Sequence, residues 1–418
     1  MARLHWEVQL TNMSGAGEAA DILPFGGARG SNQTAVRAYN ERLVLSLVRR
    51  HGSMAKVDIA RSTGLSAQTV SVIMRSLEND GLLLRGEPKK GRVGQPSVPL
   101  SLNPKGAFSI GLKIGRRSAD LILMDFVGTI LDQLHETFAY PSPPGILKFV
   151  RGGVEKLTAR FSPDELKRVA GIGMAAPFEL WNWADEAGAS QIESDAWRNF
   201  DLQSEVAALA PFPVFMENDA TSACGAELVF GLGTQYPDFI YFFIGSFIGG
   251  GVVLNSSLFK GRTGTAGALG SMPVPDGKGG TRQLIEAASV SVLERMLRDA
   301  AIDPRPLWYS ANDWRDFGAP LDTWIEHTAE ALACAIVASA SVIDFGAAII
   351  DGGFPDWVRT RIVLATDKAL GRLDLRGIIV PEIRAGEVGS NARAIGGASL
   401  PLFSRYLLDF NSFLKETS

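Results

Sequence analysis

The stretch from Ser66 to Asp80 carries polar side chains that could read the bases of DNA. Gln68, Thr69 and Ser71 lie at its start, and amide and hydroxyl groups can match the donor and acceptor patterns of base edges in the major groove. We predict these three residues to be the base readers. Ser66, which opens the stretch, and Arg75, further along it, complete the expected set of DNA contacts.

A second group of side chains could hold the DNA backbone. Lys89, Lys90 and Arg92 lie among glycines, between two short apolar runs at Leu82–Leu84 and Val98–Leu100. Two strands closing on a basic loop form a wing that can contact phosphates or the minor groove. The alternative is that this basic hairpin is only a solvated turn.

The base readers need a helix to position them, and the apolar residues of their stretch predict one. These residues recur at i, i+3, i+4 and i+7, the spacing of one helical face. They are Val70, Ile73, Met74 and Leu77. Ser66 can cap the start of this helix, and Gly81 can end it in the left-handed conformation.

Two further helices are expected before this one. Ala55 to Ser62 forms a short helix, and Gly64-Leu65 supplies a tight turn, since glycine permits a positive φ and the leucine can pack between the helices. Ala35–Arg50 has apolar residues at helical spacing and should support the pair. The arrangement is typical of a winged helix-turn-helix, although any three-helix unit has the same periodicity.

Charge is distributed unevenly along the 418 residues. Ser31–Lys105 contains twelve Lys and Arg residues against five Asp and Glu residues, whereas the whole chain has a net charge of -4. The basic part is therefore the part expected to face DNA, and phosphate should repel the acidic remainder. With 46% hydrophobic and 21% charged residues, the chain is expected to be globular, with two or three domains.

The compartment and the domain limits follow from composition. Cys224 and Cys334 are the only cysteines, too few for a disulfide framework, which suits a reducing cytoplasm. No signal peptide or membrane span is expected, because the apolar runs are interrupted by glycine and polar residues. We expect a flexible tail over 1–33, the winged helix-turn-helix over 34–104, and an α/β domain over 105–418, where short β-rich runs alternate with helical ones.

Several segments together resemble the ROK family, which contains repressors, open reading frames and sugar kinases. They are RGSNQTAVRAYNERLVLSLVRRHG, the helix-turn-helix with its GRVGQP wing, ENDA, IGGG and GTAGALGSMPV. The resemblance is to the repressor branch, similar to the xylose and N-acetylglucosamine repressors, and covers nearly everything after the first thirty residues. It implies an actin-like, two-lobed domain with a sugar site in its cleft, and a homodimer or homotetramer.

The sequence departs from the kinases of the family where phosphate would bind. Those kinases place an Asp-x-Gly-Gly-Thr loop after the first strand, and here the corresponding run begins at Lys113 and continues through Arg116 and Arg117. Phe247 stands where the family usually has glycine, beside an intact Gly249–Gly251. ATP therefore has no evident cradle, and we expect neither enzymatic activity nor a cofactor.

The resemblance also implies a ligand site at Asn218, Asp219, Ser271 and Glu286. Asp219 matches the general base of the family, and a carboxylate can hold a sugar hydroxyl without phosphoryl transfer. The alternatives are that Asn218 and Asp219 only cap the following helix, and that Glu286 is an exposed acid at a helix start. Ala268 and Ser271 replace a glutamate and a histidine of the family, so sugar specificity should differ.

The zinc site of the family is expected to be missing. It takes one histidine and three cysteines, but the histidine position here is Ser271, and Pro275–Glu286 contains no cysteine. We predict no metal and a loop held by packing alone.

The sequence thus predicts a cytoplasmic transcription regulator that binds a palindromic operator in double-stranded DNA. It is expected to repress genes of carbohydrate uptake or catabolism and to be tuned by a sugar or sugar derivative. Two alternatives are a sugar kinase fused to a DNA-binding module and a DNA-binding protein without a ligand.

Overall fold

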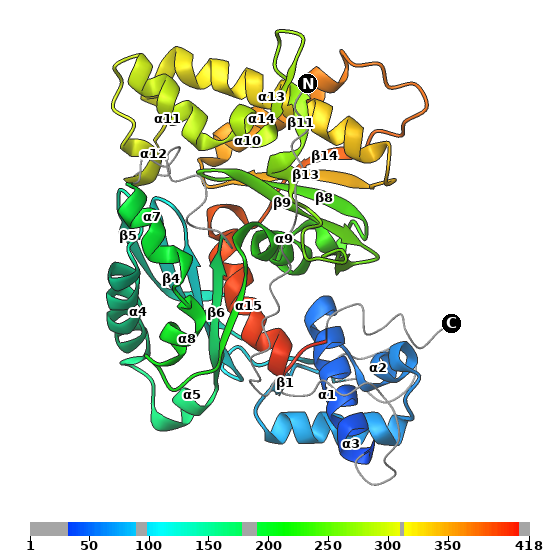
Figure 1. The fold of residues 1–418 in the computed structure, drawn as a ribbon. Helices are drawn as coiled ribbons and strands as arrows, with labels where there is room; N and C mark the ends of the chain where they lie inside the picture. Colours follow the sequence, from blue (N-terminus) through cyan, green and yellow to red (C-terminus); the bar gives the residue numbers. More distant parts are fainter. Residues whose placement is uncertain (1–31, 89–97, 178–189, 310–312, 409–418) are drawn as a thin grey trace.

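The structure is a computed structural model that describes residues 32–88, 98–177, 190–309 and 313–408. Figure 1 shows a small, mainly helical amino-terminal domain beside two α/β lobes. Each lobe contains a five-stranded sheet. The α/β architecture expected from the sequence is therefore present.

The amino-terminal domain packs three helices against a two-stranded antiparallel sheet. Its elements are α1 (Asn32–His51), α2 (Lys56–Thr63), α3 (Ala67–Asn79), β1 (Leu83–Arg85) and β2 (Leu100–Leu102). Gly64 ends α2 with φ of 69° and Gly81 follows α3 with φ of 71°, so both adopt the left-handed conformation expected for them. The three helices and the two strands confirm the winged helix-turn-helix, with the second strand two residues later than predicted.

The first lobe is built on a mixed sheet with strand order β5-β4-β3-β6-β7. Its strands are β3 (Phe108–Ile114), β4 (Ser118–Asp125), β5 (Ile130–Thr137), β6 (Val169–Ala176) and β7 (Val214–Asn218). The helices α4 (Pro143–Thr158), α5 (Pro163–Lys167), α7 (Gln191–Arg198) and α8 (Leu202–Ala207) belong to the same lobe. Strand β7 is half-buried along its whole length.

The second lobe has a sheet with strand order β10-β9-β8-β13-β14. Its strands are β8 (Phe239–Ile244), β9 (Ile248–Leu254), β10 (Ser257–Leu258), β13 (Ala347–Gly352) and β14 (Glu382–Ala385), beside a hairpin of β11 (Pro273–Pro275) and β12 (Thr281–Gln283). Its helices are α10 (Leu284–Ala288), α11 (Val290–Asp299), α12 (Pro306–Tyr309), α13 (Gly318–Ala340) and α14 (Asp356–Leu370). Short 3-10 helices are η1 (Leu232–Thr234), η2 (Leu269–Ser271), η3 (Arg315–Phe317) and η4 (Gly389–Asn391).

The segment 284–299 forms two helices instead of one. Ser289 separates α10 from α11 with an extended backbone (φ -72°, ψ 153°), and its hydroxyl accepts a hydrogen bond from the Ile248 N–H at 3.0 Å. Ile248 belongs to β9, so a contact with a distant strand stabilises the break between the helices. Local periodicity could not reveal this contact. In the described part of the chain, no helix is both long and apolar enough to cross a membrane.

Two helices lie between the sheets and connect the lobes. Helix α15 (Ala392–Arg405) packs on β3 and β6 of the first lobe, and α9 (Asp219–Phe230) packs between α15 and β9 of the second lobe. The carboxyl end of α15 reaches the amino-terminal domain, where Leu402 and Leu407 share one hydrophobic cluster with Val44 and Val48 of α1. The domain boundary predicted at residue 104 falls between β2 and β3, but the hydrophobic core is continuous across it.

Candidate functional site

Helix α3 presents a polar face to solvent. Its apolar residues Val70, Ile73, Met74 and Leu77 are all buried, as predicted. The Ser66 hydroxyl caps the helix by accepting a hydrogen bond from the Thr69 N–H at 3.1 Å. The capped start of α3 and its buried apolar residues fix the orientation of the helix. The opposite face of α3 therefore lies at the surface.

The exposed residues of α3 differ in part from those predicted. Gln68 and Arg75 are exposed, whereas Ser71 is half-buried and Thr69 turns its hydroxyl to Ser66 at 2.8 Å. Val72, 55% exposed, and Asn79 were missed. The signal for them was spacing, because Gln68, Val72, Arg75 and Asn79 follow one another by four, three and four residues, along one helical face.

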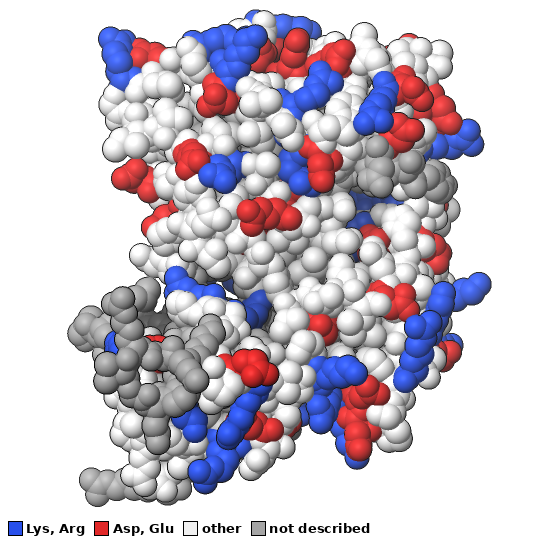
Figure 2. Space-filling model, turned by 180° about the vertical axis from the view of Figure 1, so that it is seen from behind, with Lys and Arg blue, Asp and Glu red and all other residues white. Residues whose placement is uncertain are grey.

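Neighbouring elements hold α3 in place. Arg37 of α1 donates to the Ser76 hydroxyl at 3.0 Å, and the Arg85 guanidinium contacts Glu78. The hydrogen bond from Arg85 lowers the pKa of Glu78. The predicted wing residues Lys89, Lys90 and Arg92 lie outside the described residues. Seen from behind, the coloured surface of the two lobes intersperses acidic and basic groups, without one extended basic patch (Figure 2).

A cavity of about 280 Å³, here called the interlobe cavity, is lined by residues of both lobes and of the loops between them. Its polar side chains are Arg116, Asn218, Asp219, Thr221, Ser246, Thr265, Ser271 and Arg393. Strand β7 ends at Asn218 and α9 begins at Asp219, so the junction of the two elements delivers both side chains to the cavity. The volume is at the small end of ligand sites and suits a monosaccharide better than a nucleotide.

Asn218 and Asp219 each have a partner in the described structure. The Asn218 amide oxygen accepts from the N–H groups of Ala220 at 3.0 Å and Thr221 at 3.2 Å, so Asn218 does cap α9. The Asp219 carboxylate pairs with the Arg393 guanidinium at 3.3 Å. Arg393 in turn lies over the Phe243 ring, 4.8 Å from its centre. The Asp219 carboxylate is thus a hydrogen-bond acceptor whose orientation is fixed by the Arg393 guanidinium.

Charged side chains of β3, β4 and β5 meet beside the loop that follows β3. Lys113, only 4% exposed, contacts the Asp120 carboxylate at 3.0 Å, and the other oxygen of Asp120 lies 2.6 Å from His135 Nδ1. Burial, together with the nearby charge of Arg393, lowers the pKa of Lys113 to about 8. Burial alone would raise the pKa of Asp120, but Lys113 and His135 hold it below its ordinary value.

The two phosphate loops expected of a kinase contact each other through their side chains. The Arg116 guanidinium carbon lies 4.4 Å from the centre of the Phe247 ring. Arg116 belongs to the loop after β3 and Phe247 to the loop before β9. The two bulky side chains occupy space that a pair of glycine-rich loops would leave to a ligand.

Comparison with known proteins agrees with this geometry. The profile of the ROK family matches residues 109–401, and that of winged helix-turn-helix DNA-binding domains matches residues 37–83. The chain belongs to the ROK family. The xylose repressor of Bacillus subtilis is 28% identical over 245 residues, which cover 58% of this chain and 62% of the repressor, less than two thirds of its length. The transcriptional dual regulator NagC of Escherichia coli is 23% identical over 290 residues, which cover 68% of this chain and 69% of NagC.

Solved structures show the same fold. A ROK family transcriptional regulator described as a homologue of the E. coli MLC protein superposes with a TM-score of 0.64 at 19% identity, covering 88% of this chain and 96% of that one. A ROK glucokinase from Streptomyces griseus, in complex with glucose and AMPPNP, gives 0.55 at 22% identity and covers 70% of this chain and 99% of the kinase. Repressors and kinases of the ROK family thus share this architecture.

The remaining predicted ligand residues divide between two environments. Ser271, at the end of η2, lines the interlobe cavity together with Asn218 and Asp219. Glu286 does not line it, which corrects the expectation from the ROK resemblance. Its carboxylate turns back to accept a hydrogen bond from the Gln283 N–H at 2.9 Å, and Ile285 lines the cavity instead. The alternative of an exposed acid at a helix start describes Glu286 better.

The hairpin β11–β12 occupies the position expected for the ROK zinc loop. No group of three or more potential metal ligands occurs among the residues that the structure describes. The expectation that packing alone holds this loop is wrong. Asp276 accepts hydrogen bonds from the N–H groups of Lys278 at 2.7 Å and Gly280 at 2.9 Å, and these bonds lower its pKa.

Proposed function

We propose that this ROK protein is a DNA-binding repressor whose affinity for a palindromic operator is tuned by a sugar or sugar derivative in the interlobe cavity. Gln68, Val72, Arg75 and Asn79 would face the major groove, with the apolar Val72 able to contact a thymine methyl group. The observation that carries the proposal is a physical connection from the cavity to α1, made by α9 and α15.

The connection begins at the cavity. Asp219 is the first residue of α9 and Arg393 is the second residue of α15, and their ion pair joins the two helix starts. A ligand hydroxyl that binds Asp219 changes this pair directly. Both helices therefore start at the point where the effector would bind.

The helices pack closely along their length. A Cβ atom added to Gly396 of α15 would lie 1.9 Å from the Ser222 carbonyl oxygen of α9. The two helix backbones are therefore closer together than a residue with a Cβ atom would allow. Small shifts of one helix must therefore be transmitted to the other, because close-packed interiors do not deform freely.

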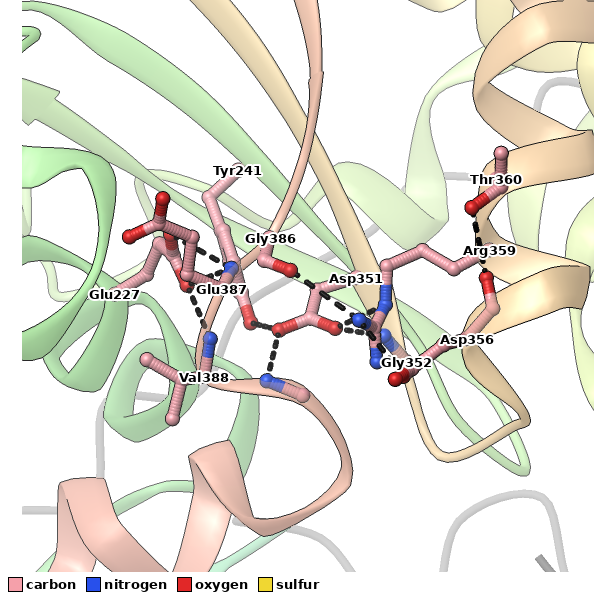
Figure 3. Close-up of polar contacts among 11 residues, drawn as sticks. Glu227, Tyr241, Asp351, Gly352, Asp356, Arg359, Thr360, Gly386, Glu387 and Val388 are labelled. Atoms are coloured by element: carbon pink, nitrogen blue, oxygen red, sulfur yellow. Dashed lines mark hydrogen bonds and ion pairs between the residues drawn. The ribbon is translucent and has the colours of Figure 1, made fainter. Parts of the chain in front are cut away.

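A buried polar network also ties α9 to the segment that leads into α15 (Figure 3). The Glu227 carboxylate accepts hydrogen bonds from the backbone N–H groups of Glu387 and Val388, each at 3.2 Å. Burial raises the pKa of Glu227, and these bonds oppose that rise. Asp351 fixes the same segment, accepting from the Gly389 N–H at 3.0 Å while it pairs with Arg359 at 2.9 Å.

The connection ends at α1 of the DNA-binding domain. The Arg49 guanidinium carbon lies 4.6 Å from the Phe230 ring centre, at the end of α9, and 5.3 Å from that of Phe403 in α15. Arg42 donates to the backbone oxygens of Phe403 at 2.8 Å and Leu407 at 2.9 Å. We call Arg49 with its two phenylalanine rings the arginine joint.

The mechanism requires that effector affinity differ between two arrangements of the lobes, because a ligand shifts an equilibrium only by that difference. Movement of α9 and α15 would turn α1, and with it the attached α3. In a homodimer or homotetramer this changes the spacing of two recognition helices, which must match half-sites about 34–36 Å apart or a multiple of it.

The proposal includes no phosphoryl transfer. Lys113 stands where the ROK kinases are expected to carry a carboxylate, Arg116 and Phe247 fill the space between the two loops, and Asp219 is held by Arg393. A general base in a kinase must reach the attacking hydroxyl, and the ion pair with Arg393 occupies one oxygen of the Asp219 carboxylate.

The test is operator binding against a panel of neutral monosaccharides, sugar phosphates and polyols. An operator selected from random duplexes, labelled with a fluorophore, reports binding by anisotropy. At least one compound should change the operator Kd about 5- to 150-fold, the usual range of allosteric coupling. A flat response across the panel would favour a ligand-independent DNA-binding protein, and rapid ATP-dependent phosphorylation of a sugar would favour the kinase alternative.

A further inference from the structure

A cavity of about 160 Å³, here called the joint cavity, lies at the arginine joint. Its lining comes from α1, from the end of α9 with the adjoining η1, and from the segment 403–408 at the end of α15. Among the described residues, it shares none with the lining of the interlobe cavity. A molecule in the joint cavity would therefore contact the DNA-binding domain and both connecting helices without touching the interlobe cavity.

The Arg49 guanidinium lines the joint cavity and has aromatic rings, but no anion, beside it. It lies over the rings of Phe230 and Phe403, and its N–H groups have no acceptor among the described residues. The described lining of the cavity contains no Asp or Glu. Burial alone lowers the pKa of Arg49 to about 10, since no described acidic side chain acts on it. A charge that is partly removed from water without a counter-ion is costly, and a ligand anion would offset that cost.

Two hydroxyl groups in the same lining are also without partners. The side chains of Thr234 and Ser256 make no hydrogen bond to any residue that the structure describes. The third hydroxyl is already used, because Ser46 accepts from the Leu408 N–H at 2.9 Å and donates to the Arg42 carbonyl at 2.8 Å. The cavity thus offers hydroxyl donors in addition to those of the guanidinium.

The rest of the lining is largely apolar. It includes Leu228 and Val229 of α9, Phe403 of α15, and the buried Leu407 and Leu408 that follow α15. Donors and apolar side chains together favour an amphipathic ligand, with acceptor oxygens at one end and hydrocarbon at the other. The volume is little more than half that of the interlobe cavity, so the ligand must be small.

We propose that the joint cavity binds a short-chain aliphatic monocarboxylate, as a second ligand site independent of the interlobe cavity. A planar carboxylate matches the paired N–H groups of a guanidinium, and such charge-assisted hydrogen bonds are among the strong ones. The single negative charge balances the single charge of Arg49, and the hydrocarbon chain removes leucine surface from water. Inorganic anions would satisfy the donors but would leave this apolar surface uncovered.

A ligand at this site would hold α1 against α9 and α15. It binds between three segments and so favours the arrangement in which they adjoin, about 11-fold at a ligand concentration ten times Kd. The carboxylate site itself does not depend on the proposed function. Its effect on operator binding does, because that effect requires the arginine joint to control the position of α3.

The experiment titrates sodium butyrate into the full chain and follows the NMR line width of the butyrate methyl group, at an ionic strength kept constant with chloride. Saturable binding is expected, with a Kd on the order of 1 mM for so small a ligand. Butanamide, which has the same shape without the charge, should bind at least about tenfold more weakly.

Variants locate the bound butyrate. Arg49→Met should weaken binding about 10- to 100-fold, because hydrogen bonds to a charged group are lost. Arg361→Met removes an arginine that lies over the Trp357 ring in α14, and it should bind butyrate as the wild type does. Thr234→Val guards against misfolding of Arg49→Met, because it keeps the side-chain shape and removes one hydroxyl; it should weaken binding about two- to tenfold.

Three results would overturn the proposal. They are the absence of saturable butyrate binding, equal butyrate affinity in the wild type and Arg49→Met, and butanamide affinity equal to that of butyrate. Inorganic phosphate is titrated in parallel, and phosphate that binds more tightly than butyrate and requires Arg49 would also reject a carboxylate site. Operator binding is measured separately with and without butyrate. Butyrate that binds at Arg49 and leaves the operator Kd unchanged would reject the role of the arginine joint in the proposed function, and would leave the carboxylate site established.

Discussion

Replacing Arg49 by methionine should disconnect the interlobe cavity from the DNA-binding domain. Methionine keeps an unbranched, apolar stem but removes the guanidinium that lies between Phe230 and Phe403. The two ring centres are 4.6 and 5.3 Å from the guanidinium carbon, within the distance of about 6 Å at which cation–π attraction acts. The change thus removes the arginine joint and leaves the packing of α1 largely intact.

The magnitude follows from these two contacts. Each cation–π contact contributes about 0.5–1 kcal/mol when exposed and about 2 kcal/mol when desolvated. Arg49 is half-buried, and burial lowers its pKa to about 10, so it remains charged at pH 7. The joint should therefore contribute about 1–3 kcal/mol, which equals the usual coupling energy between two sites. The loss of this energy is large enough to bring the operator Kd with effector to within about twofold of the operator Kd without effector.

The assay is the anisotropy titration of labelled operator, with and without effector, at several salt concentrations. Arg361→Met is the matched control, since Arg361 lies over the Trp357 ring at 5.9 Å in α14, away from the joint. The control should keep the full effector response, and both variants should keep the salt dependence of the wild type.

Two results would refute the reasoning about Arg49. One is an effector response in Arg49→Met that equals that of the wild type, which would mean that the joint transmits nothing. The other is a salt dependence reduced by about one unit of slope, because that is the signature of a lost phosphate contact. Arg49 would then be a DNA contact.

Three further predictions concern DNA reading, the ligand site and the helix contact. Gln68→Ala should relax base preference by about 1–3 kcal/mol, whereas Arg92→Ala should weaken binding to all sequences and reduce the salt slope by about 1; uniform loss from Gln68→Ala, measured by anisotropy on operator variants, would remove Gln68 from the base readers. Asp219→Asn should abolish the response to effector while operator binding without effector persists, and a retained response would mean that the ligand lies elsewhere. Gly396→Ala should lower the free energy of unfolding by about 1–3 kcal/mol in a denaturant titration, because the new Cβ would overlap the Ser222 oxygen of α9; unchanged stability would show that α9 and α15 separate easily.

The DNA-binding domain was predictable because its signals are local. Ser66 caps α3, Gly81 follows it with a positive φ, and the apolar face is buried, as spacing indicated. Two details were not evident from the sequence: Thr69, which stays a predicted base reader, turns its hydroxyl to Ser66, and the exposed Val72 was not considered because it is apolar.

The ligand site was predictable only in part, because its key contacts join distant segments. The family resemblance indicated Asp219, but its partner Arg393 lies 174 residues further on. Arg49 likewise meets Phe230 and Phe403, and nothing in the local pattern of any of the three indicates the contact. Glu286 was misplaced because the resemblance could not show that its carboxylate turns back to Gln283.

Coupling between the cavity and α3 can be measured from the ligand side. Linkage requires that operator change effector affinity by the same factor as effector changes operator affinity. Calorimetric titration of the effector into the free chain and into the operator complex should therefore give two Kd values that differ by that factor, about 5- to 150-fold. Equal effector affinity in the presence and absence of operator would contradict the account.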